Sequence, residues 1–287
     1  MIKDKFLGCS LLLTLTVLLT SAVGCAQQTV KQTQEVKPVP VPVQSGMFGI
    51  EQKAVDVLKA SSDRLAASRT MKFTAVVFYE SPSRVGPPLI YTAKSEVALQ
   101  RPNKLRVITP GDGPASEFYY NGKTMMAYSP AENLVAIADA PPTIDAALEE
   151  AFHSAAIYYP FTDVIVADPY KDIAEGLTLA FYIGQSQVVD GTLTDMVAYE
   201  THGTFVQMWI GAKDKLPRMA RAFYANDPLQ LRHGVMFSNW KLNAAIPAKT
   251  FSSSKAMKAN RIPFDRPDAL IPPGVNPLAE DNPAKTK

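Results

Sequence analysis

The stretch GTFVQMWIGAKDKLPRMARAFY, residues 203–224, predicts two antiparallel strands joined by a short charged loop. The first strand, Phe205–Ile210, is apolar at both its odd and its even positions. Antiparallel strands usually alternate, because one face of the sheet packs on the core and the other meets water. A strand that is apolar on both faces therefore needs a dry neighbour on each side. One neighbour can be a helix, and the other can be a second helix, another protein or an apolar ligand.

The surrounding sequence predicts an α+β domain over residues 47–258. Apolar residues at helical spacing predict one helix within residues 50–69 and a second within 142–158. Strand-like segments occupy most of the remainder, and Asn121-Gly122 and Asp190-Gly191 predict tight hairpin turns. This order indicates one antiparallel sheet with a few helices packed on it. A long sheet twists and curls, so it acquires a concave and a convex face.

Aromatic residues are the candidates for lining a cavity on the concave face. The predicted lining residues are Phe205, Trp209, Phe223, Trp240, Phe118 and Tyr120. For Trp209 and Trp240, core packing or anchoring at a sheet edge is the alternative, and parity alone does not tell which face is concave. An empty apolar cavity costs roughly 24 cal/mol per Å³, so a real cavity implies a guest or a closable lid. The alternative is that the helices cover the whole face and leave no cavity.

Composition excludes some partners. The chain of 287 residues carries a formal net charge of +2 and is 47% hydrophobic. Without a basic field, nucleic acid is not expected as a partner. Both cysteines lie in the first 25 residues, so the predicted domain contains no disulfide.

The N-terminus carries a targeting signal, predicted over residues 1–25. Lys3 and Lys5 precede an apolar run of about 18 residues that ends in small residues. This length also suits a short membrane-spanning helix, whereas the small residues favour cleavage.

The end of this segment, AVGC at residues 22–25, resembles a bacterial lipobox, although Ala22 stands where Leu, Val or Ile is usual. We therefore predict lipidation at Cys25, which would anchor the protein to a membrane. Secretion after cleavage beside Ala26 is the alternative. Ala26 in place of Asp after the cysteine favours sorting to the outer membrane in Gram-negative bacteria.

Proline-rich segments flank the predicted domain. Residues 26–46 include KPVPVPV, whose prolines prevent a helix and favour polyproline II, a semi-rigid spacer. Such a tether would hold a domain clear of a membrane surface. Residues 259–287 are also rich in proline and polar residues, and we predict a mostly disordered tail.

The sequence contains no recognisable motif for catalysis or metal binding. His153, His202 and His233 have no close ligand pairing, so no zinc site, other metal site or cofactor is expected. The acidic run over residues 163–175, with Asp163, Asp168, Asp172 and Glu175, matches no calcium loop and is interpreted as a solvated loop. Asp190 is interpreted as a turn residue. We expect no enzymatic activity, with an envelope hydrolase as the third alternative.

The order of motifs from Gly184 to Phe251 resembles the DUF2092 family of predicted periplasmic proteins. The residues that carry the resemblance are Gly184, Asp190, Gly191, Trp209, Ile210, Pro217, Arg218, Trp240 and Phe251. The resemblance extends to a wider group, the LolA/LolB-like lipoprotein carriers. It implies an unclosed antiparallel β half-barrel with helices plugging the concave face, and a hydrophobic ligand cavity.

These expectations combine into one hypothesis. The protein is a cell-envelope lipoprotein, anchored on the periplasmic side, that binds or carries an acyl chain or a lipoprotein without catalysing a reaction. The alternative is a structural or scaffolding envelope lipoprotein whose concave face is filled by its own helices. A lipidated Cys25 departs from the free periplasmic chaperones of the wider group and matches its membrane-held members.

Overall fold

The computed structural model describes residues 49–111 and 114–266, all within one unit of the chain, Gln44–Lys287. The predicted targeting segment, Cys25 and the predicted tether lie outside the described residues. Within the described ranges, no helix has the length and apolar character needed to cross a membrane.

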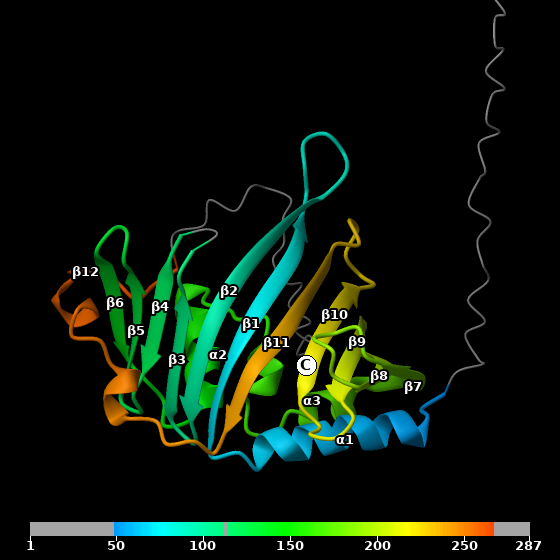
Figure 1. Cartoon of the computed structure of the whole chain (residues 1–287). Helices are drawn as coiled ribbons and strands as arrows, with labels where there is room; N and C mark the ends of the chain where they lie inside the picture. The colour runs from blue at the N-terminus through cyan, green and yellow to red at the C-terminus, as the bar shows by residue number, and fades with distance from the viewer. Residues whose placement is uncertain (1–48, 112–113, 267–287) are drawn as a thin grey trace, which may run out of the picture. The chain divides into compact units, whose positions relative to one another are not determined.

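The strands form one twelve-stranded sheet, which confirms the α+β half-barrel (Figure 1). In the order in which they lie side by side, they are β12 (Asn260–Ile262), β6 (Leu134–Asp139), β5 (Thr124–Ser129), β4 (Ser116–Tyr120), β3 (Lys104–Thr109), β2 (Leu89–Gln100), β1 (Thr70–Ser81), β11 (Arg232–Leu242), β10 (Pro217–Tyr224), β9 (Thr204–Gly211), β8 (Thr194–Thr201) and β7 (Leu177–Ser186). Neighbours are antiparallel except β12 and β6, which are parallel. The order ends at β12 on one side and β7 on the other, so the described strands form an open sheet.

The helices pack on one face of the sheet, called the inner face here. They are α1 (Gln52–Ala66), α2 (Ile144–Ala155), α3 (Lys171–Gly176) and the 3-10 turn η1 (Thr162–Val164). Two further 3-10 turns, η2 (Ala248–Phe251) and η3 (Ala256–Lys258), belong to the C-terminal segment described below. α1 packs on the β7–β8 end of the sheet through Ala54, Val57 and Leu58. Its N-terminus is fixed to β7, because Glu51 N–H donates to the Ala180 carbonyl oxygen at 2.7 Å.

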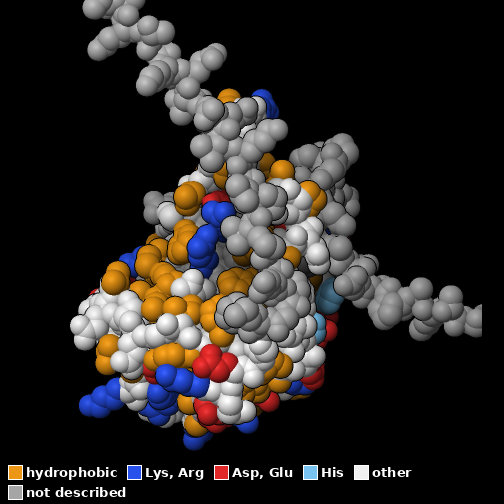
Figure 2. Space-filling view, turned by 90° about the vertical axis from the view of Figure 1, so that its right-hand side faces the viewer, with side chains coloured by type: hydrophobic (Ala, Val, Ile, Leu, Met, Phe, Trp, Pro, Cys, Tyr) orange, Lys and Arg blue, Asp and Glu red, His pale blue; other side chains and the backbone are white. Residues whose placement is uncertain are grey.

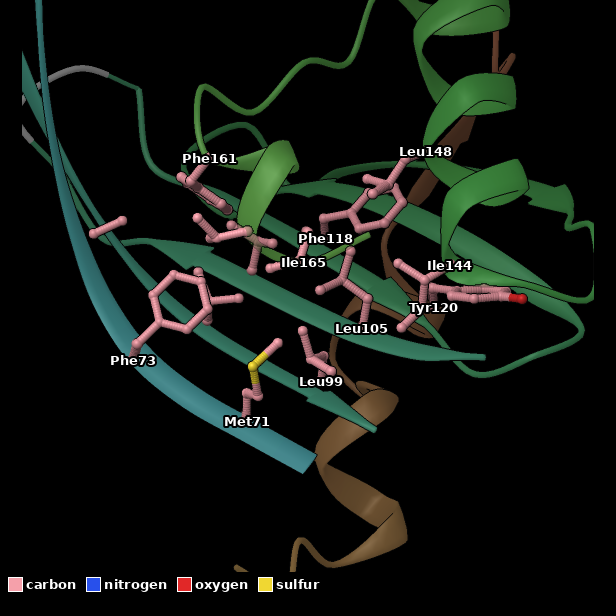
Figure 3. Close-up of a cluster of buried hydrophobic side chains, with 14 of the residues drawn as sticks. Met71, Phe73, Leu99, Leu105, Phe118, Tyr120, Ile144, Leu148, Phe161 and Ile165 are labelled. Atoms are coloured by element: carbon pink, nitrogen blue, oxygen red, sulfur yellow. The ribbon is translucent and has the colours of Figure 1, made fainter. Parts of the chain in front are cut away.

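The inner face of β1–β5 is filled by α2 and by the segment that follows it (Figure 3). α2 begins where the Thr143 hydroxyl accepts the N–H of Ala146, an N-cap that satisfies one free helix donor. The buried side chains that meet here include Leu99, Leu105, Phe118, Tyr120, Ile144, Leu148, Phe161 and Ile165. This half of the concave face is therefore plugged, as the resemblance implied.

The C-terminal segment covers the outer face at β4–β6 and then joins the sheet. Ala256 and Ala259 pack on Tyr119, Met126 and Tyr128 in a separate buried cluster. Strand β12 follows directly and pairs with β6. The folded part thus continues beyond the predicted boundary at residue 258, while residues 267–287 of the predicted tail lie outside the described residues.

The predicted hairpin turns differ in their backbone. Asp190 and Gly191 have φ values of +51° and +63°, as a turn with two left-handed central residues requires. Between β4 and β5 only Gly122 has a positive φ, +93°. Asn121 acts there through its side chain, whose Oδ1 accepts the N–H of Lys123 at 2.9 Å and that of Thr124 at 3.0 Å. Both hairpins form, but the β4–β5 hairpin uses an Asx-type turn at Asn121.

Residues 203–224 form β9, β10 and their loop, as predicted. Phe205 pairs with Phe223 and Trp209 pairs with Met219 across the hairpin. In the loop, the carboxylate of Asp214 forms an ion pair with Arg218. The apolar residues of β9 divide between the two faces of the sheet, so the inner face at this end needs its own cover.

Candidate functional site

A pocket of about 270 Å³ lies on the inner face, between β8–β11, α1, α3 and residues 158–169. We call it the inner pocket. Its sheet wall is mostly apolar and includes Tyr199, Val206, Met208, Ile210, Ala220, Ala222, Val235 and Phe237. The small side chains at 220 and 222 leave space that larger residues would fill.

The alternation of β9 decides which residues reach the inner pocket. Val206, Met208 and Ile210 line it. The residues between them point to the other face, because successive strand side chains alternate. The apolar residues at even positions of β9 therefore face the inner pocket, and those at odd positions face the opposite side of the sheet.

Helix α1 forms the second wall. Leu58, Ser61, Ser62 and Leu65 line the pocket and follow the spacing of one helix face. The two serines are 4% and 5% exposed, and they add small polar groups to an otherwise apolar wall.

Residues 158–169 form the third wall and are held from two sides. The guanidinium of Arg101 donates to the carbonyl oxygens of Ile165 at 3.0 Å and Val166 at 2.8 Å. The carboxylate of Asp145, in the first turn of α2, accepts the N–H of Ala167 at 3.1 and 3.2 Å. Burial lowers the pKa of Arg101, while the charge of Asp145 opposes that effect. These bonds fix the irregular backbone at the pocket.

Phe161 separates the inner pocket from the filled core. Its ring lies in an edge-to-face contact with Phe73 at 5.9 Å and stacks on Tyr159 at 5.4 Å. The side chain is 2% exposed, and it belongs both to the core and to the pocket lining. Together with Leu65, Val164, Val235 and Phe237, which also belong to both, it separates the two halves of the inner face.

The polar part of the pocket lining contains acids, phenols and imidazoles. The hydroxyl of Tyr224 lies 3.0 Å from Nδ1 of His233, and burial lowers the pKa of His233, which keeps the imidazole uncharged at neutral pH. Burial raises the pKa of Asp163, and the charge of Asp172 raises it further. On the face shown in Figure 2, histidine and acidic side chains lie together at the right-hand edge, and a broad hydrophobic area lies on the left-hand part of the same face.

The aromatic residues predicted to line the cavity lie elsewhere. Phe118 and Tyr120 are buried under α2, where the Tyr120 hydroxyl donates to the Pro141 carbonyl oxygen. Trp240 packs on Phe73, with ring centroids 4.5 Å apart, and its Nε1–H donates to the Pro217 carbonyl oxygen at 2.9 Å. None of these side chains is among the residues that line the inner pocket.

The other predicted aromatics belong to the alternate register of the same strands. Phe205 and Trp209 occupy the β9 positions between the pocket residues, and Phe223 is paired with Phe205 on β10. All three are partly buried. The β9–β10 hairpin contributes to the pocket, but the residues of this hairpin that line the pocket are mainly those of the opposite parity.

The acidic run divides in the structure. Asp163 and Asp172 line the inner pocket. The Asp168 carboxylate accepts the N–H of Lys171 at 3.2 Å near the start of α3, and Glu175 pairs with Lys171 at 4.0 Å. Among the described residues, no group of three or more His, Cys, Asp or Glu side chains converges as a metal site would require.

The histidines also separate. His202 and His233 line the inner pocket, whereas His153 lies on α2 and is exposed. No sequence motif links the two pocket histidines, since His202 lies between β8 and β9 and His233 lies in β11. The sequence does contain a signal for the pocket itself. Apolar residues occupy even positions of β9, and alanines occupy even positions of the neighbouring strand β10.

An open antiparallel half-barrel with an apolar pocket beside a helix-filled core is the architecture that these observations define. A family model described as "Predicted periplasmic protein (DUF2092)" matches residues 54–265. The chain belongs to this family, which confirms the resemblance noted from the sequence.

Comparison with solved structures gives likenesses with low identity. MucB has a TM-score of 0.44 and 14% identity over 71% of this chain and 64% of that chain, so this chain spans about two-thirds of its length. LprF from Mycobacterium bovis has a TM-score of 0.44 and 16% identity, covering 69% and 98%. A LolA superfamily protein, NE2245 from Nitrosomonas europaea, has a TM-score of 0.34 and 9% identity, covering 70% and 97%. At these values the likenesses carry no argument about function. No curated protein sequence matches the chain.

Proposed function

We propose that this protein is a membrane-tethered periplasmic binding protein that holds one apolar chain, free or attached to a lipoprotein, in the inner pocket. The observation that carries the proposal is the contrast between the two halves of the inner face. Beneath β1–β5, α2 and Phe161 fill the concavity with the protein's own side chains. Beneath β8–β11, an apolar pocket of about 270 Å³ is left.

The energetics favour a guest in this pocket. At about 24 cal/mol per Å³, a closed, dry and empty cavity of 270 Å³ would cost about 6 kcal/mol, which is an upper bound here because the pocket opens to solvent. That is comparable with the whole stability of many domains, about 5–15 kcal/mol. Water can enter at the polar rim but gains few hydrogen bonds along the apolar walls. An apolar chain would satisfy those walls by contact.

The proposed anchor is a lipid on Cys25, followed by the tether over residues 26–46, with sorting to the outer membrane as the proposed destination. The family description as a periplasmic protein supports this side of the membrane. A tether of this kind would let the domain take a chain from the adjacent bilayer or from a lipoprotein partner. We propose binding without catalysis.

Adjacent residues of β9 provide a matched pair of variants. Val206 lines the inner pocket, and Gln207 points to the other face. Val206→Trp places an indole inside the pocket, and Gln207→Trp places the same group outside it. The uncharged fluorescent probe N-phenyl-1-naphthylamine is titrated into each purified protein.

We expect the wild-type and Gln207→Trp proteins to bind one equivalent of probe, and Val206→Trp to bind it at least about tenfold more weakly. Native mass spectrometry of protein purified without detergent should show co-purifying lipid in the first two. No binding by the wild-type protein would overturn the proposal.

A scaffolding role is the second candidate, and the filled core beneath α2 is the observation that favours it. Under that role the probe would fail to bind, and the Val206→Trp variant would be more stable than the wild type because it fills a void. The same titration and an unfolding curve therefore separate the two functions.

A further inference from the structure

The inner pocket contains charge of one sign only. Asp163 and Asp172 are among its lining residues, and no lysine or arginine is. Lys171, the neighbour of Asp172 in the chain, lies outside the lining and is directed to Glu175, 4.0 Å away. An anionic head group entering this pocket would therefore meet two carboxylates and no fixed cation.

Both side chains reach solvent, so a ligand can approach them, although the protein atoms around Asp163 partly desolvate its carboxylate. Asp163 belongs to η1 and Asp172 to α3, so two separate elements bring them to the pocket. Among the described residues, neither carboxylate forms an ion pair or accepts a hydrogen bond. The charge of Asp172 raises the pKa of Asp163, which places the two groups within electrostatic reach of each other.

Aromatic rings stand beside these carboxylates. Tyr158 and Tyr224 line the pocket. Burial is the main cause of the raised pKa of Tyr224, and the charge of Asp163 contributes to it. A cation between Asp163 and Asp172 would contact oxygens of both carboxylates. It would also meet the faces of the phenol rings, which attract ammonium groups. The apolar walls would accept the chain attached to that cation.

We propose, on the basis of the binding function above, that the inner pocket selects an apolar chain with a cationic ammonium head group over one with a carboxylate or phosphate head group. The chain lies against the β8–β11 wall, and the ammonium group lies between Asp163 and Asp172. An uncharged head group is intermediate, because it loses the attraction without meeting the repulsion.

Competition among three ligands of equal chain length tests this proposal. Dodecylamine, dodecanol and dodecanoate each displace N-phenyl-1-naphthylamine from the purified protein at about pH 8 and below their micellar concentrations. We expect dodecylamine to bind at least about tenfold more tightly than dodecanoate, because reversing the head-group charge reverses its interaction with both carboxylates. Dodecanol should fall between them.

Two variants make the test specific. Asp163→Asn with Asp172→Asn should remove the preference and let dodecanoate bind as well as dodecylamine. Asp190→Asn changes the same charge in an exposed turn outside the lining, where Asn also adopts a positive φ, and should keep the preference. Equal affinities for all three ligands in the wild type, or a preference for dodecanoate, would overturn the proposal while leaving chain binding intact. Failure of the probe itself to bind would instead overturn the proposed function.

Discussion

Removing the ring of Phe161 should both destabilise the protein and enlarge the inner pocket. The ring is 2% exposed and packs on Phe73 and Tyr159. Deleting a buried phenylalanine ring costs about 3–5 kcal/mol, from lost burial and from the cavity that remains. For a domain of this size, each kcal/mol lowers Tm by about 2–4 °C, so Phe161→Ala should lose about 6–20 °C.

A control variant distinguishes the pocket from the core. Phe118 is also 2% exposed and packs against Tyr159, but it does not line the inner pocket. Phe118→Ala should lose a similar amount of stability in a urea titration. Only Phe161→Ala should change ligand binding, with a gain in affinity for longer or bulkier apolar chains.

Saturating ligand adds a second measurement. A ligand at 100 times its Kd stabilises the native state by about 2.7 kcal/mol. A long-chain alcohol should therefore recover more stability in Phe161→Ala than in Phe118→Ala. A loss of less than about 1 kcal/mol in Phe161→Ala, or wild-type binding of every chain length by both variants, would contradict the role given to Phe161.

Further predictions concern the pocket wall, its acids and the two ends of the chain. Arg101→Met removes both guanidinium hydrogen bonds to the third pocket wall. It should lower the free energy of unfolding, measured in urea, by about 2–4 kcal/mol and weaken probe binding. Unchanged stability and probe affinity would show that Arg101 is not needed to hold this wall in place. Asp163→Asn should raise Tm at pH 7, because burial and Asp172 raise the pKa of this carboxyl and penalise its ionised form in the folded state. The gain should vanish as the pH falls toward 3.8, and a gain that is equal at all pH values would contradict this cause. Cys25→Ser should abolish lipid attachment and release the protein from membranes on fractionation, and a variant that stays in the membrane fraction would contradict Cys25 as the anchor. Deleting residues 267–287 should leave Tm unchanged within about 1 °C, and a loss of several degrees would contradict a dispensable tail.

The elements that could be predicted from the sequence are those determined by residues close together in the chain. The helices predicted within residues 50–69 and 142–158 appear as α1 and α2, because their apolar residues follow one helix face. The Asp190-Gly191 turn forms because both positions adopt the left-handed backbone. These features depend on residues close together in the chain.

Features that depend on distant residues were not predictable in the same way. Strand β12 has three residues and a parallel partner that is far away in the sequence, and its proline-rich surroundings suggested a disordered tail. α3 has six residues inside an acidic run and carries no apolar stripe of its own. Each is defined by the element it packs on.

The face assignment of β9 shows the same limit within one strand. Phe205 and Trp209 are the larger side chains, and size suggested that they line a cavity. The direction in which the sheet curls decides which side chains face the pocket, and Val206 and Met208 are the ones that line it. A cavity needs space, so small residues opposite the strand, such as Ala222, are the better indicator.

The most direct test of an apolar chain in the inner pocket is a crystal structure of the protein with 12-bromododecan-1-ol, in which anomalous scattering locates the bromine atom. We expect a single bromine peak on the inner face, enclosed by Leu58, Val206 and Met208, with the hydroxyl toward Asp163. A pocket closed by the protein's own side chains, or bromine bound only on the outer face beside Trp209, would contradict it.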